Sequence, residues 1–206
     1  MQRISLHYDK VLKGEFGLKR LNFLFVFQVN CPGCFLYGFP LVSKLFEKYC
    51  HQISFLGLST AFEDFELNNE ANSRLLVEQG EFVGETKKAF WQQGITSFPG
   101  SIRFPIAMDK MAGSTFDYHT AALRVCELYP NFSGRAPFEK ERTIQNVIKY
   151  LSNQESLSLT FTLNGLRGTP TFLLFNDAFE VVHHSFGYID YEEMEREIDY
   201  LTEKFD

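Results

Sequence analysis

The chain has 206 residues, of which 45% are hydrophobic and 22% charged, and it is long enough for one globular domain with a large core. Its net charge of −6 and sequence pI near 5.4 argue against nucleic acid as a partner. No apolar run reaches the length of a membrane span, and the first ten residues lack the apolar segment of a signal peptide. We therefore expect no membrane partner and a cytoplasmic location.

The first predicted element is a buried strand over residues 21–27, an apolar run with Asn22 as its one polar residue, which includes three of the 23 phenylalanines. Cys31-Pro32-Gly33-Cys34 follows almost directly. Apolar residues then recur at helical spacing as far as residue 49, with Pro40 as a predicted kink.

A cysteine between a strand and a helix N-terminus lies among unpaired backbone N–H groups and at the positive end of the helix dipole. This position favours the thiolate, so Cys31 is expected to have a lowered pKa and to be the nucleophile. Cys34, three residues on, can attack a mixed disulfide and release the product. Pro32 suits the first helical turn because its missing N–H needs no partner there.

Two other interpretations of the motif are a zinc site and a structural disulfide. A zinc site would need two more ligands, and no second C-x-x-C or H-x₃₋₅-H follows. His183 and His184, the only histidine cluster, are adjacent on a predicted strand and point to opposite faces. Four cysteines are too few for a disulfide scaffold, so we favour a redox pair and predict no metal and no cofactor.

The middle of the chain predicts further elements of an α/β fold. A short buried strand covers residues 53–58, and residues 70–93 have helical patterns broken at Gly80 and Gly94. Another short strand is predicted over residues 102–107. Residues 111–160 are less regular, with a helix expected over residues 139–151, and we interpret them as a partly helical insertion within a single domain of residues 1–206.

The C-terminal part predicts a hairpin and a helix. Strands are expected over residues 171–175 and 180–184 with a turn at Asn176-Asp177, and an amphipathic helix follows Asp190. The order of elements predicts a mixed central sheet with helices on both faces.

This order resembles the thioredoxin superfamily, because a C-P-x-C stands at the first helix and Gly168-Thr169-Pro170-Thr171 precedes the hairpin. The resemblance implies a thioredoxin-like fold with a cis bond before Pro170, facing the redox motif. It also implies that the backbone of Thr169 binds an incoming substrate strand beside Cys31. The strand-helix-strand pattern from Phe55 to Asp109 looks most like the TlpA-like and peroxiredoxin-like branch.

The chain departs from the thioredoxin pattern at two positions beside the motif. Phe25 stands where thioredoxin has a buried aspartate, and Asn30 replaces the tryptophan that usually precedes the first cysteine. A proton acceptor must come from elsewhere, and Glu63 is the candidate because TlpA-like proteins often carry a glutamate near this strand end. A solvated loop carboxylate is the alternative role for Glu63.

The leading functional hypothesis is a thiol–disulfide oxidoreductase that acts on a disulfide-containing protein or a small thiol, with an external reductant or oxidant. The alternatives are a peroxide-reducing redoxin, a non-enzymatic binding module of the same fold, and a DsbA-like oxidase as a fold-level rival. The peroxiredoxin pattern P-x₃-[ST]-x₂-C is absent before Cys31.

Three further residues are assigned to the core. Cys50 and Cys126 are expected to pack as small apolar side chains, since free cysteine is among the most buried residue types. Trp91, the single tryptophan, is expected to pack there as well.

Overall fold

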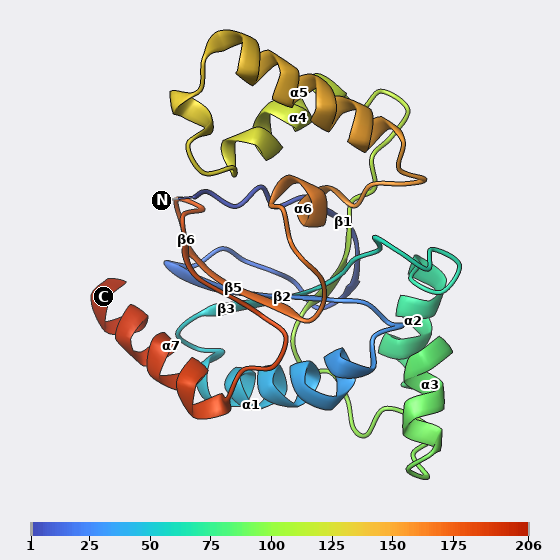
Figure 1. The fold of residues 1–206 in the computed structure, drawn as a ribbon. Coiled ribbons are helices and arrows are strands. Elements are labelled where there is room, and N and C mark those ends of the chain that lie inside the picture. Colours follow the sequence, from blue (N-terminus) through green and yellow to red (C-terminus); the bar gives the residue numbers. More distant parts are fainter. Residues whose placement is uncertain (1, 206) are drawn as a thin grey trace.

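The computed structural model describes residues 2–205, which are built around one six-stranded mixed sheet of order β1-β4-β3-β2-β5-β6 (Figure 1). The three adjacent strands β2, β3 and β4 run parallel, whereas β5, β6 and β1 are antiparallel to their neighbours. The mixed α/β sheet predicted from the sequence is thus confirmed. The strands are β1 (Tyr8–Lys13), β2 (Leu21–Phe27), β3 (Ser54–Ser59), β4 (Ile106–Asp109), β5 (Thr171–Asn176) and β6 (Val181–Phe186).

Helices cover both faces of this sheet (Figure 1). α1 and α7 lie against one face, α6 lies on the other, and α2 and α3 stand at the end of the sheet. The helices are α1 (Phe39–Tyr49), α2 (Glu70–Gln79), α3 (Gly84–Trp91), α4 (Tyr118–Glu127), α5 (Pro137–Ser152), α6 (Leu159–Leu163) and α7 (Tyr191–Phe205). No helix within residues 2–205 is both long and apolar enough to cross a bilayer.

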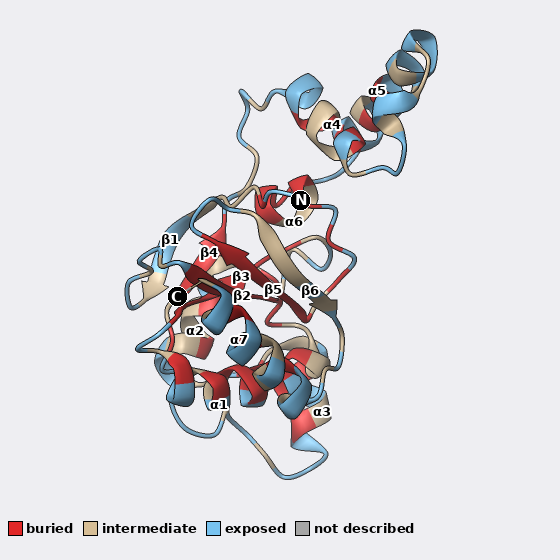
Figure 2. Cartoon of the chain, turned by 90° about the vertical axis from the view of Figure 1, so that its left-hand side faces the viewer, coloured by how far each residue is buried: buried red, intermediate tan, exposed pale blue. Residues whose placement is uncertain are grey.

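β2 is the most buried strand because it lies in the middle of the sheet and both of its faces are covered (Figure 2). Since side chains alternate along a strand, its phenylalanines point to one face and Leu24 and Val26 to the other. The phenylalanines pack in the cluster that contains residues of α1 and α7. Leu24 and Val26 pack with Leu56, Leu58 and other residues on the α6 side.

Most predicted elements lie where the sequence places them, with one strand displaced. The helical stretch of residues 70–93 is two helices, and Gly80 ends the first in the left-handed conformation at φ 71°. The strand predicted over residues 102–107 begins only at Ile106. Pro105 has no N–H to donate to a ladder, and its carbonyl instead accepts the Gly57 N–H at 2.8 Å, which brings the chain onto the sheet.

The prediction that Trp91 packs in the core is wrong. Trp91 is 62% exposed, and the Lys87 ammonium lies over its ring. α3 turns its buried side inward through Thr86 and Phe90, and one further residue rotates the side chain by about 100° around the helix. Trp91 therefore faces solvent.

α4 and α5 form a helical hairpin that projects beyond α6, on the side away from the sheet (Figures 1 and 2). The two helices have their own apolar cluster, which includes Ala122, Cys126, Ile144 and Val147 and is distinct from the two clusters on the sheet. These helices make up most of residues 111–160. Their description as an insertion within one domain stays a prediction.

Asp109 at the end of β4 ties the sheet to α6. It is buried, and its carboxylate accepts the Thr60 hydroxyl at 2.9 Å and the backbone N–H groups of Thr160 and Phe161 at 2.8 and 3.0 Å. Burial raises the pKa of Asp109 to about 6, although the three hydrogen bonds act in the opposite direction. The folded protein therefore holds a proton here that the unfolded chain releases at a lower pH.

This shift predicts a pH dependence of stability. Between the unfolded pKa of 3.8 and the folded pKa of about 6, the folded state binds more protons, so the free energy of unfolding falls as pH rises. The contribution is about 3 kcal/mol, at about 1.4 kcal/mol per pKa unit. Denaturant unfolding between pH 4 and 7 should show this loss in the natural protein and not in Asp109→Asn. Asp177→Asn, in the exposed turn after β5, is the control and should keep the loss.

Candidate active site

The Cys31–Cys34 motif stands where β2 ends and the first helix begins. The two cysteines form a disulfide with their Cα atoms 5.4 Å apart. Cys34 is fully buried, whereas Cys31 is half-buried and is the sulfur that faces the surface. The Cys34 N–H lies 3.2 Å from the Cys31 sulfur, so a backbone donor points at this atom, as the strand-to-helix context predicts.

The helix after the motif opens with a π-helical turn over Cys34–Gly38. The N–H of Phe39 donates to the carbonyl of Cys34, which is a five-residue spacing. The irregularity of this helix thus lies at residues 34–38 and not at Pro40, where a kink was predicted. Pro40 lies in the first turn of α1, where proline is tolerated.

The loop before β5 completes the site. The Thr169–Pro170 peptide bond is cis, and the Thr169 carbonyl oxygen lies 3.6 Å from the Cys31 sulfur. Pro170 packs over the motif helix at Gly33 and Gly38. The structure thus brings together Cys31, Cys34, Thr169 and Pro170, which are about 140 residues apart in the sequence.

Gln28 is a member of the site that the sequence analysis missed. It is buried, and its side-chain oxygen accepts the Thr169 hydroxyl at 3.2 Å while its amide nitrogen donates to the Glu63 carbonyl at 3.4 Å. It therefore connects the proline loop to the loop after β3. An amide that directly follows the apolar residues 23–27 was the available signal, since a buried polar side chain needs partners.

Asn30, the second departure from the thioredoxin pattern, is a connector on the other side of the motif. Its side chain donates to Asp64 at 2.8 Å and accepts the Glu85 N–H at 2.7 Å, and its backbone N–H donates to Asn68 at 2.9 Å. Through these hydrogen bonds Asn30, which directly precedes Cys31, connects the motif to the loop after β3 and to the start of α3.

Phe25 fills the space beneath the motif with an aromatic ring. The ring is fully buried and stacks on Phe172 at 5.4 Å between centroids, with Phe39 against it edge-on at 5.1 Å. The Glu63 side chain is exposed. Its backbone carbonyl accepts hydrogen bonds from the side-chain amides of Gln28 and Asn68, and this connects the residue to the site. Its role as a proton acceptor stays a prediction.

The other residues singled out from the sequence lie away from the motif. His183 faces Glu197 of α7 at 3.8 Å, whereas His184 lies on the opposite side of β6 near Leu173. No three metal-ligating side chains come together within residues 2–205. Cys126 is buried as predicted, and burial raises the pKa of its thiol. Cys50 is only half-buried, at the end of α1.

Exposed apolar side chains surround the motif, and we call them the aromatic rim. Tyr37 and Tyr188 are 47% and 68% exposed, and their rings pack edge-on at 5.3 Å. Leu36 precedes Tyr37 on the π-helical turn, and Phe186 lies against Gly168 beside the proline loop. Exposed apolar groups gathered at one place mark an interaction surface.

The fold matches that of two solved proteins at low sequence identity. The structure matches a thiol-disulfide isomerase from Corynebacterium glutamicum with a TM-score of 0.60 and 18% identity, covering 98% of this chain and 96% of that one. It matches a thioredoxin-like superfamily protein with a TM-score of 0.56 and 20% identity, covering 98% and 97%. Neither the protein-family models nor the curated proteins gave a match. The chain has a thioredoxin-like fold, as the resemblance implied.

The contact between the π-helical turn and β2 yields a prediction. Gly33 and Gly38 have nearly the same helical φ, −61° and −66°, so their backbones tolerate alanine equally. A Cβ on Gly38 would stand 2.7 Å from the Phe25 ring, whereas one on Gly33 would meet only ordinary contacts at 3.8 Å or more. Gly38→Ala should lower the free energy of unfolding of the oxidised protein by about 1–3 kcal/mol.

Gly33→Ala is the matched control and should leave the stability unchanged or slightly higher, because alanine restricts the unfolded chain more than glycine. Equal denaturation midpoints for the two variants would contradict the close packing of the turn on Phe25.

Proposed function

We propose that this protein is a thiol–disulfide oxidoreductase of the TlpA-like kind, with Cys31 as nucleophile and Cys34 as resolving cysteine. The observation that carries the proposal is the half-buried Cys31 sulfur between the Cys34 N–H and the Thr169 carbonyl, with its disulfide partner fully buried. An incoming sulfur can reach Cys31 and cannot reach Cys34. The difference in burial supports this assignment of the two roles.

In the reducing direction, the Cys31 thiolate attacks one sulfur of the substrate disulfide, and the other substrate sulfur leaves as a thiolate and takes up a proton. Cys34 then loses its proton and attacks the Cys31 sulfur of the mixed disulfide. The second substrate thiolate leaves, and the Cys31–Cys34 disulfide forms. The substrate has gained two electrons from the protein, and an external dithiol, itself oxidised to a disulfide, supplies two electrons that restore the two thiols of Cys31 and Cys34.

Two features of the site support these steps. The backbone N–H of Cys34 stabilises negative charge on the Cys31 sulfur when the disulfide is open. The Thr169 backbone lies beside that sulfur and is available to an extended substrate segment, while Gln28 holds the Thr169 side chain. Glu63 remains our candidate for accepting the Cys34 proton, because Phe25 supplies no acid beneath the motif.

The aromatic rim favours a polypeptide as the disulfide substrate. Leu36, Tyr37, Phe186 and Tyr188 flank the exposed side of the motif and offer apolar contacts to the residues beside a substrate cysteine. A small hydrophilic disulfide would use few of these contacts. Both directions of electron flow are open to this chemistry, and the potential of the Cys31–Cys34 pair against glutathione decides between them. The cytoplasmic location stays a prediction, which cell fractionation tests.

The role of Cys34 is tested by Cys34→Ser. Without the resolving thiol, the mixed disulfide through Cys31 should accumulate with a peptide disulfide and disappear on adding dithiothreitol, as seen by intact-protein mass spectrometry. Cys31→Ser is the control and should trap nothing, because the buried Cys34 is out of reach.

Absence of any adduct in Cys34→Ser, together with no disulfide reduction by the natural protein, would reject the proposal. Rapid consumption of hydrogen peroxide under the same conditions would favour the redoxin alternative, in which Cys31 passes through a sulfenic acid. Undiminished capture of a protein partner by the double serine variant would favour a binding module.

The aromatic rim is tested by Tyr188→Ser. Loss of the exposed ring should raise KM about fivefold for an apolar peptide disulfide, which corresponds to about 1 kcal/mol. KM for bis(2-hydroxyethyl) disulfide should not change. Tyr200→Ser removes a comparably exposed ring from α7 and should affect neither substrate. An equal rise of KM with both substrates would assign Tyr188 to the stability of the motif instead.

A further inference from the structure

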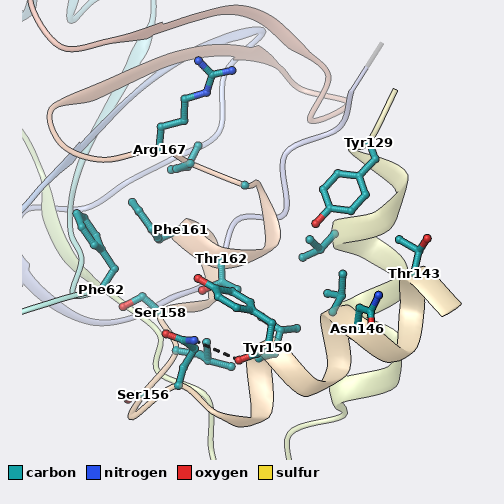
Figure 3. A pocket seen from close by; sticks show the side chains of 17 residues that line it. Phe62, Tyr129, Thr143, Asn146, Tyr150, Ser156, Ser158, Phe161, Thr162 and Arg167 are labelled. Carbon is teal, nitrogen blue, oxygen red and sulfur yellow. Dashed lines mark hydrogen bonds between the residues drawn. The ribbon is translucent and has the colours of Figure 1, made fainter. Parts of the chain in front are cut away.

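A cleft of about 640 Å³ separates the α4–α5 hairpin from the body of the protein (Figure 3). On the body side, the rings of Phe62 and Phe161 stack face to face at 4.2 Å. The hairpin wall carries Tyr129 from beyond α4, and Asn146 and Tyr150 from α5. The cleft is of the size that holds small organic ligands in proteins.

The base of the cleft is apolar and its mouth is polar. Val147, Leu151 and Leu157 of the hairpin cluster line it and are buried. Asn146 and Tyr150 are exposed, and within residues 2–205 their side-chain polar atoms form no hydrogen bond with another residue. The cleft therefore has an apolar base and, at its mouth, side chains whose hydrogen-bonding groups are free to bind a ligand.

The charge of the lining distinguishes between possible ligands. Arg167 is the one charged residue among those that line the cleft. It stands at one end, above Phe161, with its guanidinium directed away from the other labelled side chains, so a ligand would meet it at the end of the cleft and not between the aromatic rings (Figure 3). It is exposed and has neither an ion pair nor a side-chain hydrogen bond within residues 2–205. In a chain with a net charge of −6, a cleft lined by one arginine and no acid is a local exception. An unpaired guanidinium favours a carboxylate as its partner.

The cleft is separate from the redox motif. Cys31, Cys34 and Thr169 do not line it, and the residues of the aromatic rim do not either. Loss of redox activity would therefore leave this site in place, so the two proposals can fail independently.

We propose that the cleft binds an amphipathic organic carboxylate, with its apolar body between the Phe62–Phe161 pair and the base, and its carboxylate at Arg167. Tyr129 and Asn146 lie opposite the phenylalanine pair across the opening (Figure 3). A cation with the same apolar body would meet Arg167 and no acid, and is disfavoured on that ground.

The test compares decanoate with decyltrimethylammonium, which share an apolar chain and differ in the sign of the head group. Each is titrated below its micelle concentration into the full ¹⁵N-labelled chain with its disulfide intact. Decanoate should shift the amide resonances of α5 and of residues 157–167, with at least tenfold higher affinity than the cation. Equal affinities, or shifts confined to the aromatic rim, would overturn the proposal.

Three variants complete the test. Arg167→Gln should weaken decanoate binding about tenfold, whereas Arg142→Gln, an exposed arginine of α5 outside the cleft, should leave it unchanged. Asn146→Trp places a large ring from an exposed position into the opening and should abolish binding without a change in melting temperature. Unchanged binding in Arg167→Gln or in Asn146→Trp would overturn the proposal.

Discussion

The active-site end of this fold depends on one close approach, that of the π-helical turn Cys34–Gly38 to the aromatic ring of Phe25. A side chain at residue 38 would overlap this ring, so the turn reaches its position because Gly38 has none. Pro170 packs on the same glycine from another side. The strand, the motif helix and the proline loop therefore meet at a single residue, and the distance from the Thr169 carbonyl to the Cys31 sulfur follows from that meeting.

The phenylalanines give this junction its rigidity. Phe25 contacts Phe27, Phe39, Phe104 and Phe172, so one ring joins β2, α1, β5 and the segment before β4. Rings packed in stacked and edge-on pairs leave little free volume, and such pairs add to the stability gained from burial alone. Phenylalanines thus make up much of the buried cluster on the side of the sheet that carries the Cys31–Cys34 motif. The consequence for chemistry is an apolar bed under the buried Cys34.

Local patterns predict the parts of the fold that depend on local physics. β2 is predictable because it is buried on both faces, and the motif is predictable because its residues are contiguous. β1 was missed, since half of its residues are exposed and none is fully buried, and its pairing with β4 is set by a partner almost 100 residues away. Trp91 was misplaced because a large aromatic ring favours burial on average, while the phase of α3 depends on which side meets the sheet.

In the candidate site, too, the residues in local motifs were predictable and the residues that act through long-range contacts were not. Cys31, Cys34 and Pro170 were identified from short motifs, whereas Gln28 and Asn30 act through long-range hydrogen bonds that no spacing rule encodes. The replacement of an expected aspartate and tryptophan by Phe25 and Asn30 was visible in the sequence. That Asn30 joins three neighbouring segments was not visible, because each of its partners lies more than 30 residues away.

The segment from α6 to β5 is shared by the two sites and is anchored at both ends. At its start, the Asn164 side chain accepts the Ser5 N–H at 2.8 Å and donates to the Ser5 carbonyl at 2.9 Å. At its end, Thr169 bonds Gln28, and the Thr171 hydroxyl donates to the Gly168 carbonyl at 2.7 Å. Arg167 projects between these two anchors without a hydrogen bond or ion pair of its own within residues 2–205. Because the backbone on both sides of Arg167 is held by other groups, its side chain can engage a ligand without displacing the Thr169 carbonyl from the Cys31 sulfur. The fold therefore places Arg167 two residues from Thr169 while keeping the geometry around Cys31 independent of the cleft.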